Sequence, residues 1–332
     1  MHRVMRLSGV VAGVVLAAGA HPAAADMGLP PVTQGAYVSG EGGYLLQDME
    51  GVNGHGIRSG AGPVADVIVS PEDGWFAGGM IGFSNGLPLV SGVPFNRIEA
   101  YILFGRTDDS AQDASPPLAD ITLKSVDGSI NVIGGSGGAT SVERRTTEGG
   151  LRFEGDQPFA ANTSLTWVLS PFVRLAAEDT DTLVTGCCVL YRSAEVDTWM
   201  YGATVAVEPE MWLSPGVALV GRLGAGLYGY DADASFRSFS TGLPPPDPLA
   251  AAVNDGDSGV GFRGQLGVGL KFKLFPAGVL ETFAEADYFS DVGSAVFSNS
   301  RPTDPTPSHI ATDDMWELRA GARLTIGLGA LN

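Results

Sequence analysis

The sequence predicts an all-β fold, a closed antiparallel transmembrane β-barrel of about ten strands, within a range of about eight to twelve. Three observations lead to this prediction. Segments of about ten residues alternate between apolar and polar side chains, the connections between them are alternately short and long, and the chain opens with an export signal. Short periplasmic turns and long extracellular loops are typical of barrels that cross a membrane, and no later apolar run is long enough for a membrane-spanning helix.

The export signal occupies the N-terminal end. Arg3 and Arg6 make this end positive, and residues 7–20 are almost all small or apolar. The apolar run covers about 14 residues, fewer than the roughly 18 to 20 that a membrane-spanning helix needs. Ala23-Ala24-Ala25 then offer small residues at the positions that a signal peptidase reads, which places cleavage before Asp26. We therefore expect residues 1–25 to be a cleaved signal peptide and residues 26–332 to form a single outer-membrane barrel domain.

The alternation is cleanest near the C-terminus. Between Trp316 and Leu328, every second side chain is apolar, and the other face carries Glu317, Arg319 and Arg323 among small residues. A helix would mix these two sets, because its apolar residues recur every three or four positions. The ten predicted strands cover residues 36–46, 74–84, 96–106, 144–154, 164–176, 197–208, 217–230, 260–274, 280–288 and 316–328. Residues 118–133 offer two further strands.

The connections between these strands alternate in length. The short ones are 85–95, 155–163, 209–215 and 275–278. The long ones, which are acidic and rich in Gly, Pro, Ser or Asp, are 47–73, 107–143, 177–196, 232–257 and 290–312. An even number of strands places both termini on the periplasmic side and all the long connections on the outside.

The five tryptophans provide a check that is independent of the strand assignment. If the first strand runs outward, Trp75, Trp199 and Trp316 lie at the external interface of the membrane, and Trp167 and Trp212 lie near the periplasmic one. Amphipathic rings prefer these interfaces. We therefore expect all five to form aromatic girdles around the barrel.

The overall charge restricts the partners. The chain has 19 Lys and Arg against 37 Asp and Glu, a formal net charge of −18. Nucleic acid is excluded as a partner, because phosphate binding needs clustered cations. Acidic loops suit a surface near lipopolysaccharide and divalent cations, so we expect outer-membrane lipid and lipopolysaccharide as partners. An oligomer is possible.

Two stretches resemble proteobacterial outer-membrane β-barrels of the small porin-like type. They are Tyr37-Val38-Ser39-Gly40-Glu41-Gly42-Gly43-Tyr44 near the start of the mature chain and Leu318-Arg319-Ala320-Gly321-Ala322-Arg323-Leu324 near its end. The resemblance covers nearly the whole mature chain and implies the outer membrane of a Gram-negative bacterium. One departure is that such families end their last strand on an aromatic residue, whereas this chain continues to Gly329-Ala330-Leu331-Asn332.

Three neighbouring predicted strands place charges on one face, which in a membrane barrel is the lumen. The expected lumen-lining residues are Arg263, Lys271, Lys273, Glu281, Glu285, Asp287, Glu317, Arg319 and Arg323. Such a face either fills a narrow lumen with ion pairs or selects passing solutes. The first hypothesis is a narrow porin-like channel for ions or small solutes. The alternative is a non-conducting structural or adhesive surface barrel that acts through its long acidic loops.

An enzyme is the least favoured class, and the sequence predicts no cofactor, catalytic residue or metal site. The mature chain has only two histidines, His55 and His309, and both lie in long connections. A hydrolase needs a nucleophile or an activated water beside a positioned base. Cys187 and Cys188 are adjacent, so they cannot join distant segments, and an exposed loop oddity, a strained vicinal bridge, a cross-chain disulfide and a weak metal site all remain open.

Overall fold

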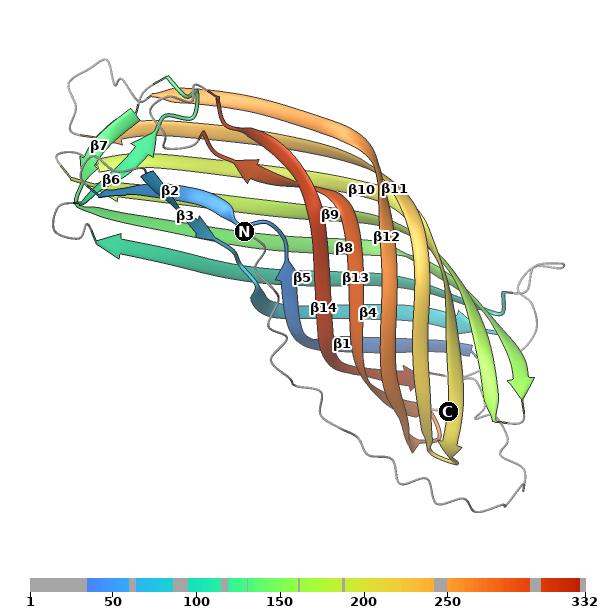
Figure 1. Ribbon diagram of the computed structural model, residues 1–332. Coiled ribbons are helices and arrows are strands. Elements are labelled where there is room, and N and C mark those ends of the chain that lie inside the picture. Colours follow the sequence, from blue (N-terminus) through green and yellow to red (C-terminus); the bar gives the residue numbers. More distant parts are fainter. Residues whose placement is uncertain are drawn as a thin grey trace.

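The computed structural model describes residues 35–59, 64–85, 95–114, 119–129, 131–160, 162–186, 189–241, 250–298 and 306–328. Strands make up almost all of their regular structure (Figure 1). No helix within these ranges is long and apolar enough to cross a membrane. The predicted signal peptide (1–25), the pair Cys187 and Cys188, and the terminal residues 329–332 lie outside the described residues.

Ten antiparallel strands form a closed barrel, which confirms the predicted fold and strand number. β1 pairs with β14 to close the ring, and there Gly43 lies opposite Gly321. A Cβ atom on Gly43 would clash with the backbone of Ala320, so glycine permits this close approach. The strands are β1 (Gly35–Asp48), β4 (Asp73–Ser84), β5 (Arg97–Ala114), β8 (Gly137–Ala160), β9 (Thr163–Thr185), β10 (Val189–Ser214), β11 (Val217–Thr241), β12 (Ala251–Phe275), β13 (Gly278–Val296) and β14 (His309–Gly327).

Several strands are much longer than the sequence predicts. β10 contains 26 residues, and β11 and β12 contain 25 each, well above the 9–11 that cross a bilayer. The predicted long connections 177–196 and 232–257 consequently consist largely of strand. By their pairing registers, β5 and β8 to β12 remain paired with one another beyond the positions of Trp75, Trp199 and Trp316, and we call this outer part of the six strands the extension. Figure 1 shows these strands continuing side by side.

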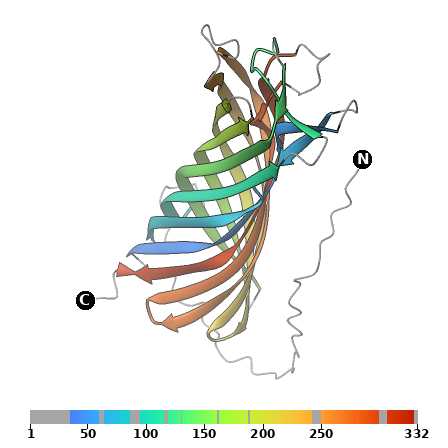
Figure 2. The same cartoon turned by 90° about the vertical axis from the view of Figure 1, so that its left-hand side faces the viewer.

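A separate four-stranded sheet lies at the end of the barrel that carries the extension (Figure 2). This small sheet contains β2 (Val52–Ser59), β3 (Val64–Val69), β6 (Ala119–Lys124) and β7 (Asn131–Gly135), in the order β3-β2-β6-β7. The two additional strands predicted in residues 118–133 therefore exist, but they do not belong to the barrel, and β2 and β3 were not predicted. Ile57, Ile121 and Leu123 of the small sheet pack against Val184 and Leu190 of the extension.

β13 and β14 leave the barrel wall before they reach the extension. β12 pairs with β13 only as far as Arg263 opposite Phe289, although β11 and β12 stay paired as far as Ser238 opposite Ala251. The departure coincides with an irregularity between Phe289 and Val292 and with a positive φ of 59° at Asp291. Bulges of this kind bend a strand. The extension is thus a curved sheet of six strands rather than a closed ring.

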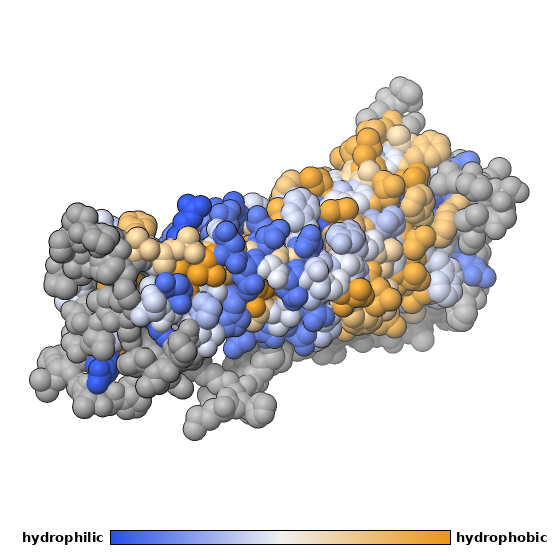
Figure 3. All heavy atoms as spheres, turned by 90° about the horizontal axis from the view of Figure 1, so that it is seen from above, coloured by the Kyte–Doolittle hydropathy of each residue, from blue (hydrophilic) through white to orange (hydrophobic). Residues whose placement is uncertain are grey.

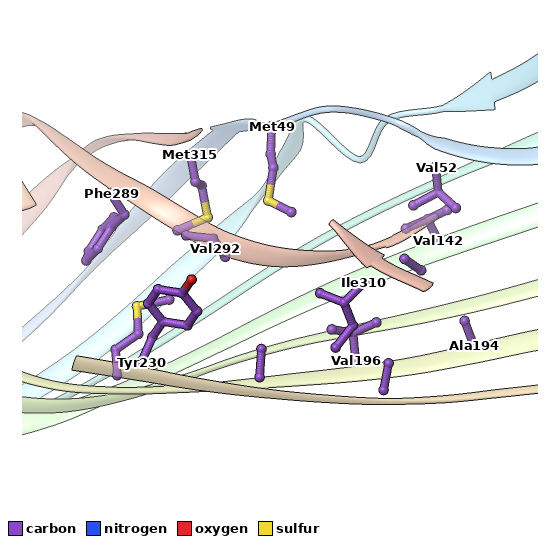
Figure 4. Close-up of a cluster of buried hydrophobic side chains, with 14 of the residues drawn as sticks. Met49, Val52, Val142, Ala194, Val196, Tyr230, Phe289, Val292, Ile310 and Met315 are labelled. Atoms are coloured by element: carbon purple, nitrogen blue, oxygen red, sulfur yellow. The ribbon is translucent and has the colours of Figure 1, made fainter. Parts of the chain in front are cut away.

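The hollow of the extension is filled by an apolar core. β13 and β14 contribute Val292, Ala295, Ile310 and Met315, and Met49 follows β1 (Figure 4). They meet buried side chains of the six-stranded sheet and of the small sheet. The remaining buried members of this core are Val52, Val69, Val126, Val142, Phe172, Ala194, Val196, Met200, Tyr228, Tyr230, Ala232, Ala234, Phe236, Phe289 and Phe297.

Candidate functional site

On the face that Figure 3 shows, apolar side chains form a broad band over the half of the barrel opposite the extension, and the extension is mostly polar. Large apolar side chains point outward in the band, among them Leu223 at 61% exposure and Leu266 at 62%. Trp75, Trp199 and Trp316 are about half exposed at its outer border. In water, so much exposed apolar surface is unfavourable, and in lipid it is the stable arrangement.

The lumen within this band is densely charged. Twelve buried or half-buried side chains form one continuous chain in which positive and negative groups alternate. In order, it contains Arg97, Glu154, Arg152, Glu208, Arg222, Glu285, Arg319, Asp287, Arg263, Glu148, Arg174 and Glu317. A closed barrel with a polar interior and an apolar exterior is the arrangement that a membrane requires. The chain therefore has the architecture of a β-barrel that spans a membrane.

Further charged side chains complete this network in the lumen of the barrel. Arg323 pairs with Glu41 at 2.6 Å and with Glu281 at 3.5 Å, and Lys271 pairs with Glu210 at 2.7 Å. Asp156 and Glu99 pair with arginines of the network. The network then holds eight cationic and eleven acidic side chains, so its formal charge is negative.

Eight of the nine residues predicted to line the lumen are members of this network. Lys273 is the exception, because it lies beside the β12–β13 turn and is exposed. The prediction missed the partners on β1, β5, β8, β9, β10 and β11. Charges at alternate positions, such as Glu148, Arg152 and Glu154 in β8 or Glu208 and Glu210 in β10, were the available signal. Which of these charged side chains form ion pairs depends on the tertiary structure.

The girdle prediction is wrong for Trp212. Trp75, Trp167, Trp199 and Trp316 are 44–53% exposed on the outer surface, but Trp212 is 9% exposed and lines the lumen. Its position explains the difference. Trp199 is at an odd position of β10 and points outward, so Trp212, at an even position, points inward as Glu208 and Glu210 do.

The lumen contains a cavity of about 240 Å³ on the periplasmic side of the network. Arg97, Arg152 and Lys271 line it together with Glu99 and Glu208. A smaller cavity of about 50 Å³ lies further outward, between Glu148, Arg263 and Arg323.

Above these cavities, a layer of buried aromatic and cationic side chains fills the lumen. The guanidinium of Arg174 lies 4.4 Å from the ring centre of Phe289, and that of Arg263 lies 4.8 Å from that of Phe172. Tyr228 packs against both aromatic rings, at 6.1 and 6.3 Å. None of the five is more than 4% exposed, and we call them the plug layer.

His55 connects the small sheet to the extension. Its Nδ1 lies 3.0 Å from the Thr140 hydroxyl, and its Nε2 lies 3.2 Å from the Asp113 carboxylate. Burial is the largest influence and lowers the pKa of His55, the Asp113 carboxylate raises it, and Arg192 lowers it again. His55 and Thr140 are almost completely buried, so they present no open surface to a substrate.

Arg192 lies buried near His55. Its guanidinium donates to the carbonyl oxygens of Asn53 and Gly54 and lies 4.0 Å from the ring centre of Phe297. Burial lowers the pKa of Arg192 to about 9, although Asp66 acts in the opposite direction. Arg192 therefore holds β2 against the inner face of the extension.

The second histidine of the mature chain, His309, has its own contact: its Nδ1 lies 3.1 Å from the backbone oxygen of Pro307. The nearby Asp313 accepts a hydrogen bond from the Glu50 backbone N–H at 3.1 Å. Within the described ranges, no group of three or more His, Cys, Asp or Glu side chains is arranged to hold a metal ion.

The sequence matches no protein-family model and no curated protein. Among solved structures, the barrel is similar to the outer membrane protease OmpT from Escherichia coli, with 9% identity, a TM-score of 0.46 and coverage of 89% of this chain and 97% of that chain. It is also similar to Ail, the attachment invasion locus protein of Yersinia pestis (12% identity, TM-score 0.22, coverage 88% and 99%). A third similar structure is the Pseudomonas putida toluene transporter TodX (8%, 0.26, coverage 89% and 90%). At these values the similarities carry no functional argument.

Proposed function

We propose that the protein is a non-conducting outer-membrane barrel that binds partners through its extracellular extension. The observation that carries this proposal is the plug layer. Arg174, Arg263, Phe172, Tyr228 and Phe289 fill the lumen where its charged network meets the apolar core of the extension. Ions cross a pore only where water or polar groups replace their hydration, and a packed apolar core offers neither.

The extension supports the binding part of the proposal. Its six strands and the small sheet share a packed core, so they present a rigid surface beyond the membrane. Loops and sheets held by a rigid scaffold are common binding surfaces. Catalysis is not part of the proposal, because His55 is buried between Thr140 and Asp113.

Lipid and lipopolysaccharide are the partners that we propose for the outer wall. The apolar band faces lipid, and carboxylates such as Asp108, Asp231 and Asp233 lie exposed on the extension. Divalent cations can connect such carboxylates to the phosphates of lipopolysaccharide. This contact would anchor the barrel without involving the lumen.

Conductance in a planar bilayer across a KCl gradient tests the proposal. The refolded wild-type protein should give no discrete openings, because the plug layer leaves no continuous aqueous path. A Phe172→Ala/Phe289→Ala double variant serves as the positive control, since it removes two aromatic rings of this layer and should produce openings. Wild-type openings of the same size as those of the variant would overturn the proposal.

A narrow ion channel is the second candidate function, and the charged cavity of about 240 Å³ favours it. Because acidic side chains outnumber cationic ones in the network, such a channel would prefer cations. Wild-type openings whose reversal potential shifts when Arg319 and Arg323 are replaced by Gln would support this candidate.

A further inference from the structure

The outer half of β12 has an edge that no strand of the described residues covers. β11 pairs with one side of residues 251–262, but β13 pairs with the other side only from Arg263 inward. Figure 1 shows β12 reaching the far end of the extension while β13 and β14 turn away from it. Residues 251–262 all belong to β12, so the backbone of this edge segment is extended.

The hydrogen bonds at the inner end of the edge show which backbone groups are available. The Phe262 backbone N–H donates to the Ser290 hydroxyl at 2.9 Å, so it points toward the β13 side. Successive residues of a strand direct their N–H and C=O groups to opposite sides. The groups of residues 252, 254, 256, 258 and 260 therefore point to the open edge.

Local contacts agree with this assignment. The Ser258 backbone N–H donates to the carboxylate of the adjacent Asp257 at 2.9 Å, a local contact rather than a ladder bond. Unpaired strand edges readily accept another strand, which adds to the sheet through its own backbone hydrogen bonds. Because every second residue of the edge directs its backbone groups to this side, the five residues together would pair with a segment of about ten residues.

The side chains beside the edge are small and acidic. Ala252, Asn254, Gly256 and Ser258 leave room for a neighbouring strand, and all four are exposed. Asp233 lies opposite Gly256 and Asp231 opposite Ser258 on β11, and both are exposed on the outer face.

The inner face of the edge is also acidic. Asp257 accepts a hydrogen bond from the Tyr230 hydroxyl at 3.1 Å, and Asp255 accepts one from the Ile310 backbone N–H at 2.9 Å. Arg237, opposite Ala252, brings a positive charge to the outer end only. Both faces next to the middle of the edge are thus negative.

We propose that the outer edge of β12 is a docking site for an extended peptide segment rich in Lys or Arg, which adds to the extension as a seventh strand. The backbone supplies the affinity, and the carboxylates on both faces select a basic partner. The same carboxylates also discourage two copies of this chain from pairing edge to edge, because like charges would then face each other. This inference rests on the proposed binding role of the extension.

The test uses the full-length protein in detergent and three synthetic twelve-residue peptides with alternating charged and β-branched residues. One peptide carries Lys, the second carries Asp at the same positions, and the third is the Lys peptide with its backbone nitrogens methylated at alternate residues. Fluorescence anisotropy measures binding. The Lys peptide should bind, and the Asp peptide and the methylated peptide should bind at least about tenfold more weakly.

Two variants at one position separate backbone pairing from simple charge attraction. Ser258→Pro removes an edge N–H and should weaken binding of the Lys peptide about tenfold, since proline is tolerated at strand edges but cannot donate. Ser258→Ala keeps the N–H and should bind within about twofold of wild type. Equal binding of the methylated and unmodified Lys peptides to the wild-type protein would overturn the inference, and so would a lack of binding by the Lys peptide.

The outcomes for the inference and for the proposed function are distinguishable. A barrel that conducts but binds the Lys peptide at β12 would refute the non-conducting role alone. A barrel that neither conducts nor binds the peptide would refute the β12 site alone.

Discussion

The same strands build two regions with opposite interiors. In the membrane-embedded half, β10 points Tyr201 and Val205 outward and Glu208 inward. In the extension, it points Glu195 outward and buries Val196. β11 makes the same exchange, from Leu223 outside and Arg222 inside to Asp233 outside and Phe236 inside.

Each strand thus keeps its alternation of apolar and polar side chains along its whole length, whereas the surrounding medium determines which of the two faces points outward. In the membrane-embedded half the apolar face contacts lipid, so the charged side chains point into the lumen and must pair with each other there. In the extension the polar face contacts water, so the apolar face of the sheet is buried in a core. The two interiors meet at the plug layer, where Arg174 and Arg263 belong to the charge network and also contact Phe289 and Phe172.

The largest loss of stability is expected when a charge is placed in the apolar interior of the extension. Phe236 is fully buried and lies 5.8 Å from Phe297, measured between ring centres. Phe236→Ala alone should cost about 3–5 kcal/mol. Phe236→Asp adds an unpaired buried charge and should unfold the extension while the membrane-embedded ring stays closed. Protease digestion of intact cells should then cleave the extension, and the barrel should retain its resistance to SDS at room temperature.

Phe239→Asp is the matched control, because Phe239 is on the same strand but 46% exposed on the outer face. It should leave the extension resistant to protease. Cleavage of both variants to the same extent would contradict the assignment of the inner and outer faces.

A smaller effect is expected from removal of a charge in the polar interior. Arg263 pairs with Glu148 at 3.0 Å and Asp287 at 3.4 Å and is 3% exposed. Arg263→Ala leaves these carboxylates short of a partner and should lower the free energy of unfolding by about 3–5 kcal/mol. Urea unfolding in lipid vesicles measures this change.

The comparison with a surface ion pair sharpens this prediction. The Arg145 side chain is 53% exposed on the extension and pairs with Asp179. Because water already solvates both groups, Arg145→Ala should cost no more than about 1 kcal/mol. Similar losses for the two variants would show that the lumen is as well hydrated as the outer surface.

The smallest effect concerns the attachment of the small sheet. Burial keeps the pKa of His55 below its ordinary value of 6.5, so the unfolded or detached state binds a proton more readily. Attachment is then fully stable above about pH 6.5 and weakens as the pH falls below it, by at most about 1.4 kcal/mol per pH unit. Hydrogen exchange of β2 between pH 7.5 and 5 should show this loss of protection.

His55→Gln should abolish the pH dependence of β2 exchange. His309→Gln is the control and should retain the pH dependence, since His309 Nδ1 contacts the backbone oxygen of Pro307 and not the small sheet. An unchanged pH dependence in His55→Gln would assign the effect to another group.

The ten barrel strands were predictable from the sequence, because each strand has its own period-two alternation of apolar and polar side chains. The C-terminal strand shows this most clearly: Glu317, Arg319 and Arg323 enter the lumen, and Trp316 and Leu318 face outward. The tryptophans were predicted to form girdles from their positions near strand ends, and four of the five are exposed on the outer surface. Trp212 points inward because it lies at an even position of β10, whereas the outward-facing Trp199 lies at an odd one.

What those strands enclose could not be predicted in the same way. Local alternation does not say whether Glu195 or Glu208 faces water or a lumen, because both sit in a regular strand. Nor does it show that β13 turns inward at Asp291, so that no other described strand pairs with the outer edge of β12, or that β2 packs against the extension through His55. These outcomes depend on contacts between residues far apart in the chain, and on the boundary between lipid and water. A single strand contains neither.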